Sequence, residues 1–79
     1  MIDAAERARM QSVPLCGPRV VARLEAIGVR RLTDLRGEDP FDLLERVNLA
    51  AGYPIWHPPM ATRALENLIA AAEHEAHEE

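Results

Sequence analysis

Residues 13–29 read VPLCGPRVVARLEAIGV, a turn that leads into a short helix. Gly17 gives the turn a permissive backbone, and we expect it to adopt a conformation that a β-carbon disfavours. Pro18 suits the first helical turn, where its missing N–H costs nothing. Gly28 stands where a helix often ends in a left-handed residue. Four apolar residues between these signals recur at helical spacing and form one face: Val20, Val21, Leu24 and Ile27.

The start of this predicted helix, 18–27, has a distinct electrostatic character. Its first backbone N–H groups have no partner within the helix, and the positive end of the helix dipole lies there. Such a site favours phosphate or another anion.

Four further helical segments follow from local signals. Asp3 is a suitable N-cap for a helix over about 4–11. Thr33 is expected to cap a single turn, 34–36, that Gly37 closes. Asp39-Pro40 starts another helix, which ends at Gly52 and has Phe41, Leu44 and Val47 as its apolar stripe. The last helix begins at about Met60, and one side of it carries Leu65, Leu68, Ile69, Ala72 and Ala76.

No segment alternates apolar and polar residues between hairpin turns, so the predicted class is all-α, a compact domain of four or five short helices. Seventy-nine residues are enough for one domain, 1–79, in which about 73–79 form a frayed acidic tail. We expect five apolar side chains to be largely buried in its core: Leu24, Ile27, Leu44, Leu65 and Leu68.

The turn and the helix after it resemble a helix-hairpin-helix motif, in which a Gly-rich turn between two short helices touches the nucleic-acid backbone. Over about 11–74 the chain is similar to a small bacterial family, the pathogenicity-locus helix-hairpin-helix proteins. The matching residues are Pro14, Gly17-Pro18, Ile27-Gly28-Val29, Leu32-Thr33-Asp34-Leu35 and Asp39-Pro40 with Leu43. The resemblance implies a SAM-like topology and a non-catalytic module that binds nucleic-acid backbone without sequence specificity.

The chain departs from the family pattern at one point of the hairpin. A glycine usually stands two or three residues before Gly17, and this chain has Leu15-Cys16 there. A side chain on that side of the turn hinders the close approach of a phosphate. The alternative is therefore a protein-interaction or homo-oligomerisation module that has kept the fold and lost the DNA contact.

The distribution of charge is compatible with both functions, nucleic-acid binding and protein interaction or homo-oligomerisation. Residues 1–36 carry seven arginines against four acids, whereas residues 37–79 carry two against nine. Such asymmetry is typical of a basic binding end, or of complementary surfaces in a homo-oligomer. The arginines also have possible internal partners in Glu25 and Asp34, or in a partner's acidic tail. For a nucleic-acid site, the candidate residues are Gly17, Arg19, Val20, Arg23 and Arg30.

The sequence offers little for catalysis, metals or cofactors, and we expect none of the three. Cys16 is the only thiol, with no histidine near it in sequence, and is expected to pack in the turn. His74 and His77 share a helix face, but two ligands do not close a metal site. Tyr53 and Trp56, the aromatic residues of the proline-rich loop 53–59, either cap the core, stack on bases or anchor a partner.

The location of the protein is also an expectation from sequence. No apolar run approaches the roughly 20 residues that a membrane span needs, and the N-terminus lacks the apolar centre of a signal peptide. A single cysteine forms no intrachain disulfide, which fits a reducing compartment. We therefore expect a cytoplasmic protein with no membrane partner.

Overall fold

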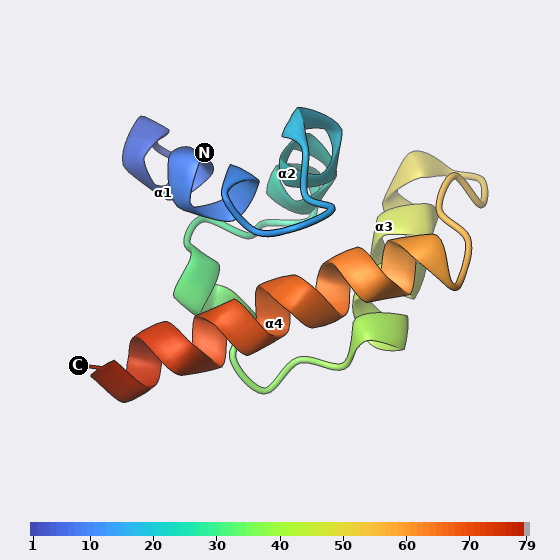
Figure 1. The fold of residues 1–79 in the computed structure, drawn as a ribbon. Coiled ribbons are helices and arrows are strands. Elements are labelled where there is room, and N and C mark those ends of the chain that lie inside the picture. Colours follow the sequence, from blue (N-terminus) through green and yellow to red (C-terminus); the bar gives the residue numbers. More distant parts are fainter. Residues whose placement is uncertain (79) are drawn as a thin grey trace.

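The longest helix, α4 (Met60–Glu78), runs along the length of the molecule, and the other elements gather on it (Figure 1). The structure is a computed structural model that describes residues 1–78, with side chains as far as residue 75. The short 3-10 helix η1 (Leu32–Leu35) and helix α3 (Pro40–Ala51) pack directly against α4. Helix α1 (Ala4–Gln11) packs on α2 (Pro18–Ala26) and on η1, and α2 also contacts α3.

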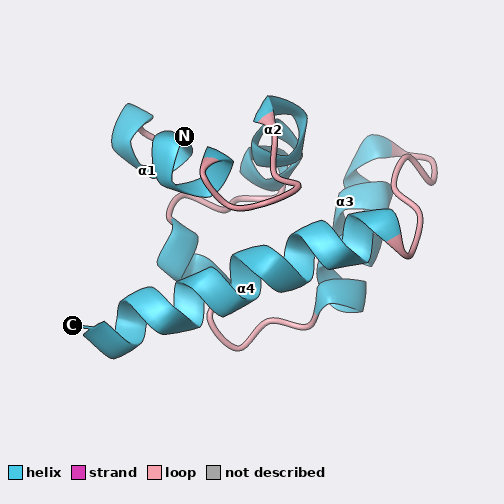
Figure 2. Cartoon of the chain, viewed as in Figure 1, coloured by secondary structure: helices cyan, strands magenta, loops and turns pink. Residues whose placement is uncertain are grey.

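All regular structure in residues 1–78 is helical, and loops join the helices (Figure 2). The predicted all-α class is confirmed. The continuous helix α4 extends to Glu78, and the predicted side-chain positions Ala76 and His77 lie outside the described side chains.

Local signals place the helix ends where the sequence predicted them. The Asp3 carboxylate accepts a hydrogen bond from the Glu6 N–H at 2.9 Å, and the Asp39 carboxylate caps α3 in the same way. The chain turns out of α2 at Gly28, whose φ is +97°. There the Val29 N–H donates to the Leu24 carbonyl, and the Gly28 N–H donates to the Glu25 carbonyl, which together make a Schellman motif.

The core is aliphatic and lies between α4 and the elements around it. Three of the five predicted core residues, Leu24, Leu65 and Leu68, are fully buried, while Ile27 and Leu44 are half-buried and pack on the rim. The other fully buried leucines are Leu32 and Leu35 from η1 and Leu43 from α3. Leucines from four elements therefore close one core in a small domain.

The predicted apolar stripe of α3 is partly wrong. Leu43 and Val47 form its buried face, whereas Phe41 is 58% exposed. Apolar residues stand at adjacent positions in this helix, so two stripes compete. The helix turns Leu43 and Val47 inward because that stripe packs against α4.

Two details of the turns also differ from the predictions. Gly17 has φ −91° and ψ −176°, an extended conformation open to any residue, so the prediction of a conformation that a β-carbon disfavours is wrong there. The left-handed residue of the hairpin is Leu15, with φ +70°. Thr33 lies inside η1 rather than capping it, and the Asp34 carboxylate instead accepts the N–H groups of Arg30 and Arg31, both at 3.0 Å.

Candidate functional site

The exposed face of α2 carries two arginines separated by small residues. Arg19, Ala22, Arg23 and Ala26 are all exposed and follow one another at helical spacing. With Ile55 and Trp56, from the loop after α3, they line an open hollow of about 630 Å³. We call this the α2 hollow. The alanines give the hollow its depth, and its lining contains no acidic side chain.

Arg19 and Arg23 make no ion pair with any described side chain. The nearest acid on α2, Glu25, faces the other way: its carboxylate accepts the Ile2 N–H at 2.8 Å and pairs with Arg7 at 3.2 Å. The Ile2 hydrogen bond and the neighbouring guanidinium lower the pKa of Glu25. Both α2 arginines therefore keep their full positive charge available to a ligand.

The first turn of α2 adds donors to this charge. Val20 and Val21 both donate their N–H groups to the Gly17 carbonyl. In the part of the chain that the structure describes, the N–H groups of Gly17 and Arg19 have no acceptor. These two donors and the dipole of the helix point at the end of α2 where Arg19 lies.

The hairpin before α2 is held by α4 through long-range contacts. The Asn67 amide donates to the Pro14 carbonyl at 3.0 Å, and the Cys16 thiol lies 3.4 Å from the Ala64 carbonyl. Leu15 sits between these two anchors in its left-handed conformation, which costs a non-glycine residue on the order of 1–2 kcal/mol. Its side chain is 55% exposed at the tip of the hairpin.

Cys16 is a packing residue, as the sequence predicted. It is buried in the core, and burial raises the pKa of its thiol to about 11. The thiol is therefore protonated near neutral pH and does not supply a nucleophile.

Two of the candidate residues lie apart from the others. Val20 is half-buried and faces a second, apolar hollow instead of the α2 hollow. Arg30 lies beyond the C-terminal end of α2, after the turn at Gly28 and at the opposite end of the helix from Gly17. Its N–H and that of Arg31 hold the Asp34 carboxylate, and these hydrogen bonds lower the pKa of that carboxyl. The α2 hollow brings together Arg19 and Arg23, and Gly17 is the N-cap residue of the same helix.

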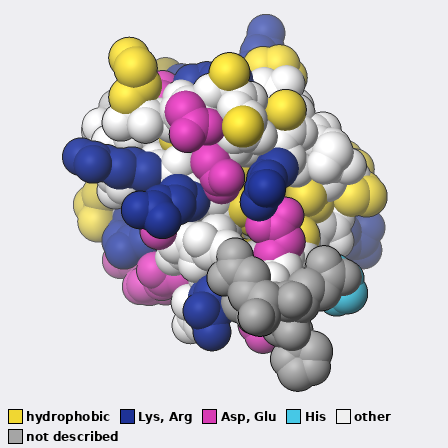
Figure 3. All heavy atoms as spheres, turned by 90° about the vertical axis from the view of Figure 1, so that its left-hand side faces the viewer, with side chains coloured by type: hydrophobic (Ala, Val, Ile, Leu, Met, Phe, Trp, Pro, Cys, Tyr) yellow, Lys and Arg dark blue, Asp and Glu magenta, His cyan; other side chains and the backbone are white. Residues whose placement is uncertain are grey.

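The arginines of α1 have a different environment. Arg7 pairs with Glu25, and Arg9 contacts both Glu6, at 3.8 Å, and Glu75, at 3.1 Å. Figure 3 shows positive and negative side chains interleaved on the face at this end of the molecule. The positive excess of residues 1–36 is therefore partly neutralised here, whereas no described acidic side chain pairs with the two arginines of α2.

Sequence reasoning missed three residues that shape the α2 hollow. Ala22 and Ala26 stand three and seven residues after Arg19, and that spacing could have shown a small-residue strip beside the arginines. Asn48, on α3, holds Trp56 by two hydrogen bonds, and no local pattern points to this pairing.

The described residues contain neither a metal centre nor a membrane-spanning helix. Within the described residues, no three His, Cys, Asp or Glu side chains are grouped so that they could hold a metal ion, and the side chain of His77 lies outside that range. None of the described helices is both long and apolar enough to cross a membrane.

Comparison with known proteins gives a family. The model of the family described as "Pathogenicity locus" (Cdd1) matches residues 3–74, which is nearly the whole chain. No curated protein and no solved structure gives a match.

Proposed function

The chain belongs to the pathogenicity locus family, and we propose that it is a non-catalytic module whose α2 face binds the phosphate backbone of nucleic acid without sequence specificity. We further propose that α1, the hairpin and α2 form a helix-hairpin-helix unit of SAM-like topology. The binding residues are Gly17, Arg19 and Arg23, while Arg30 extends the positive potential from the far end of α2.

One observation carries this proposal: Arg19 and Arg23 are exposed and one turn apart, and no acidic side chain among those the structure describes pairs with them or lines the hollow with them. Guanidinium groups bind phosphate oxygens by charge-assisted hydrogen bonds, and the N–H groups at the start of α2 add to them. Contacts of this kind position a backbone and read no bases.

A second candidate function rests on the tip of the hairpin. Leu15, Val20, Trp56 and Met60 line an open apolar hollow of about 340 Å³, and Met60 is 66% exposed. An apolar side chain at Leu15 suits a protein partner or a second copy of the chain better than it suits a phosphate. In this alternative the family fold is kept and the DNA contact is lost.

We also propose that the protein is cytoplasmic. The only cysteine of the chain is a buried free thiol, which suits the reducing cytoplasm. The proposed ligand, nucleic acid, is present in the cytoplasm.

The experiment that separates the two candidates measures affinity and mass on the same wild-type sample. Fluorescence anisotropy with labelled DNA of two unrelated sequences should give similar affinities that fall steeply between about 50 and 200 mM salt. Multi-angle light scattering should give the mass of a monomer. Absence of binding to any DNA at about 50 mM salt, together with the mass of an oligomer, would favour the protein-interaction module.

A further inference from the structure

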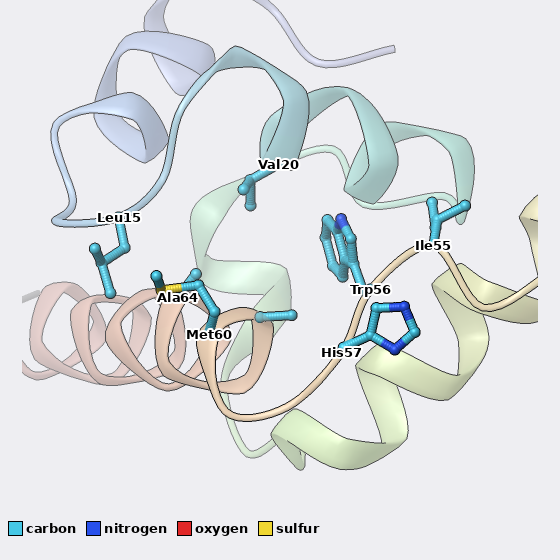
Figure 4. Close-up of a pocket in the computed structure, with 8 residues that line it drawn as sticks. Leu15, Val20, Ile55, Trp56, His57, Met60 and Ala64 are labelled. Carbon is cyan, nitrogen blue, oxygen red and sulfur yellow. The ribbon is translucent and has the colours of Figure 1, made fainter.

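Trp56 forms the wall between the two hollows. Its ring lines the α2 hollow together with Arg19 and Arg23, and it also lines the apolar hollow together with Leu15 and Met60. Figure 4 shows the ring beneath α2, with Val20 on one side of it and Ile55 on the other. The side chain is half-buried, and its indole N–H has no partner in the described part of the chain.

The ring belongs to a segment that is held firmly. The Asn48 side chain accepts the Trp56 N–H at 3.0 Å and donates to the Trp56 carbonyl at 3.1 Å. Three prolines in the same loop, Pro54, Pro58 and Pro59, restrict its backbone. Because the backbone that carries the ring is already restrained, less conformational entropy is lost when a ligand stacks on the ring.

The charge and the ring lie at a spacing that fits one strand of nucleic acid. Arg19 and Arg23 are separated by about 6 Å along the helix axis, which is comparable with the distance between neighbouring phosphates of one strand. The hollow that these residues line also includes Ala22 and Ala26, whose small side chains fill little of it. A flat group can therefore enter the hollow while the phosphates beside it remain at the arginines.

We infer that the α2 hollow binds single-stranded nucleic acid, with one base stacked on Trp56 and the flanking phosphates on Arg19 and Arg23. This inference rests on the proposed function and narrows the ligand from nucleic acid in general to a single strand. In a duplex the bases are stacked on one another and their faces are closed, so a duplex reaches the arginines but not the recessed ring. An unpaired base has a free face, and every base has one, so stacking adds affinity without sequence specificity.

The single tryptophan of the chain makes the test direct, because all tryptophan fluorescence comes from Trp56. We expect strands of about 16 nucleotides, one of deoxythymidine and one of uridine, to quench this fluorescence and to protect the ring from acrylamide. A duplex of the same length should bind in anisotropy without either effect. The DNA and RNA strands show which sugar the site accepts.

Substitution separates stacking from charge. Trp56→Leu should weaken single-strand affinity by about 5- to 150-fold, a much larger loss than the same variant shows in duplex affinity. Trp56→Phe, which keeps a ring, should recover most of the loss. Tyr53→Leu is the matched control, because Tyr53 is an exposed aromatic residue of the same loop that lines neither hollow. Circular dichroism checks that each variant is folded.

The outcomes distinguish the inference from the function on which it rests. One possible result is that single strands and duplexes both bind through Arg19 and Arg23, but single strands change neither the fluorescence of wild-type Trp56 nor its quenching by acrylamide. The inference is then overturned and the backbone-binding function stands, even if Trp56→Leu does not fold. If neither single strands nor duplexes bind at low salt, the proposed function fails as well.

Discussion

Two hydrogen bonds join the side-chain amide of Asn48 to the backbone N–H and carbonyl of Trp56. The Asn48 Oδ1 accepts from the Trp56 N–H at 3.0 Å, and its Nδ2 donates to the Trp56 carbonyl at 3.1 Å. This pair ties the proline-rich loop to α3. It fixes the backbone of Trp56 beside α3, and so it links that helix to a residue that lines the candidate site.

Asn48→Ala should lower the free energy of unfolding by about 1–3 kcal/mol, because two partly buried backbone groups lose their partner. The Trp56 emission should also shift to longer wavelength as the loop loosens and water reaches the ring. Urea unfolding followed by circular dichroism and by fluorescence measures both effects. A variant with wild-type stability and an unchanged emission maximum would show that the pair does not hold the loop.

Leu15 provides a test of the hairpin. Leu15→Gly removes the strain of the left-handed conformation, but it also raises the conformational entropy of the unfolded chain. Because the two effects oppose each other, the free energy of unfolding should stay within about 1 kcal/mol of wild type. Leu15→Val should cost about 1–2 kcal/mol, because a β-branched residue tolerates a positive φ badly. Thermal unfolding ranks the two variants. Equal stability of Leu15→Val and wild type would contradict the hairpin geometry described above.

The same glycine variant bears on binding. Removing the side chain opens the tip of the hairpin to a phosphate, so Leu15→Gly should bind DNA more tightly than wild type. If the protein-interaction alternative holds, the variant should instead lose partner affinity and gain none for DNA. Anisotropy at one fixed salt concentration is sufficient to compare the two proteins.

Cys16 makes stability depend on pH in the alkaline range. Its thiol has a folded-state pKa of about 11 against an ordinary value of 9.0, so the folded state keeps the proton longer than the unfolded state does. The contribution is fully present below pH 9 and is lost as the pH rises toward about 11, by on the order of 1–3 kcal/mol. Urea unfolding of wild type and of Cys16→Ala at several pH values measures the difference. A constant gap between the two proteins from pH 8 to 11 would contradict the burial of the thiol.

The core and the exposed stripe of α3 should respond differently to truncation. Leu24→Ala removes a fully buried side chain and should cost about 2–5 kcal/mol, enough to unfold much of a small domain. Phe41→Ala removes a mostly exposed ring and should cost less than about 1 kcal/mol. Thermal melts of both variants decide the phase of the helices. A larger loss at Phe41 than at Leu24 would mean that the faces are assigned incorrectly.

The helix ends could be predicted from sequence because their causes are local. Asp3, Asp39 and Gly28 act on backbone groups within a few residues, so the signal and the structure lie in the same segment. The buried face of α3 could not be predicted in the same way. Phe41, Leu43 and Leu44 are all apolar, and only the packing against α4 chooses between them.

The arginine pair of the candidate site could be predicted from the sequence, but the position of Trp56 beside it could not. The spacing of Arg19 and Arg23 places them on one helix face, and the structure keeps them there. The position of Trp56 beside them depends on Asn48, eight residues away in another element. The left-handed conformation at Leu15 depends in turn on contacts from α4, whereas local reasoning assigned it to Gly17 because glycine adopts it most easily.

The most direct test of the binding face compares two double variants that change the net charge equally. In Arg19→Ala/Arg23→Ala, both arginines of the α2 hollow are removed. In Arg31→Ala/Arg36→Ala, two exposed arginines outside the hollow are removed. We predict that the first variant binds DNA more weakly than wild type, with a salt slope smaller by up to about two phosphate contacts. The second should stay close to wild type in both quantities. Equal losses in the two variants, or no loss in the first, would contradict the assignment of the binding face to α2.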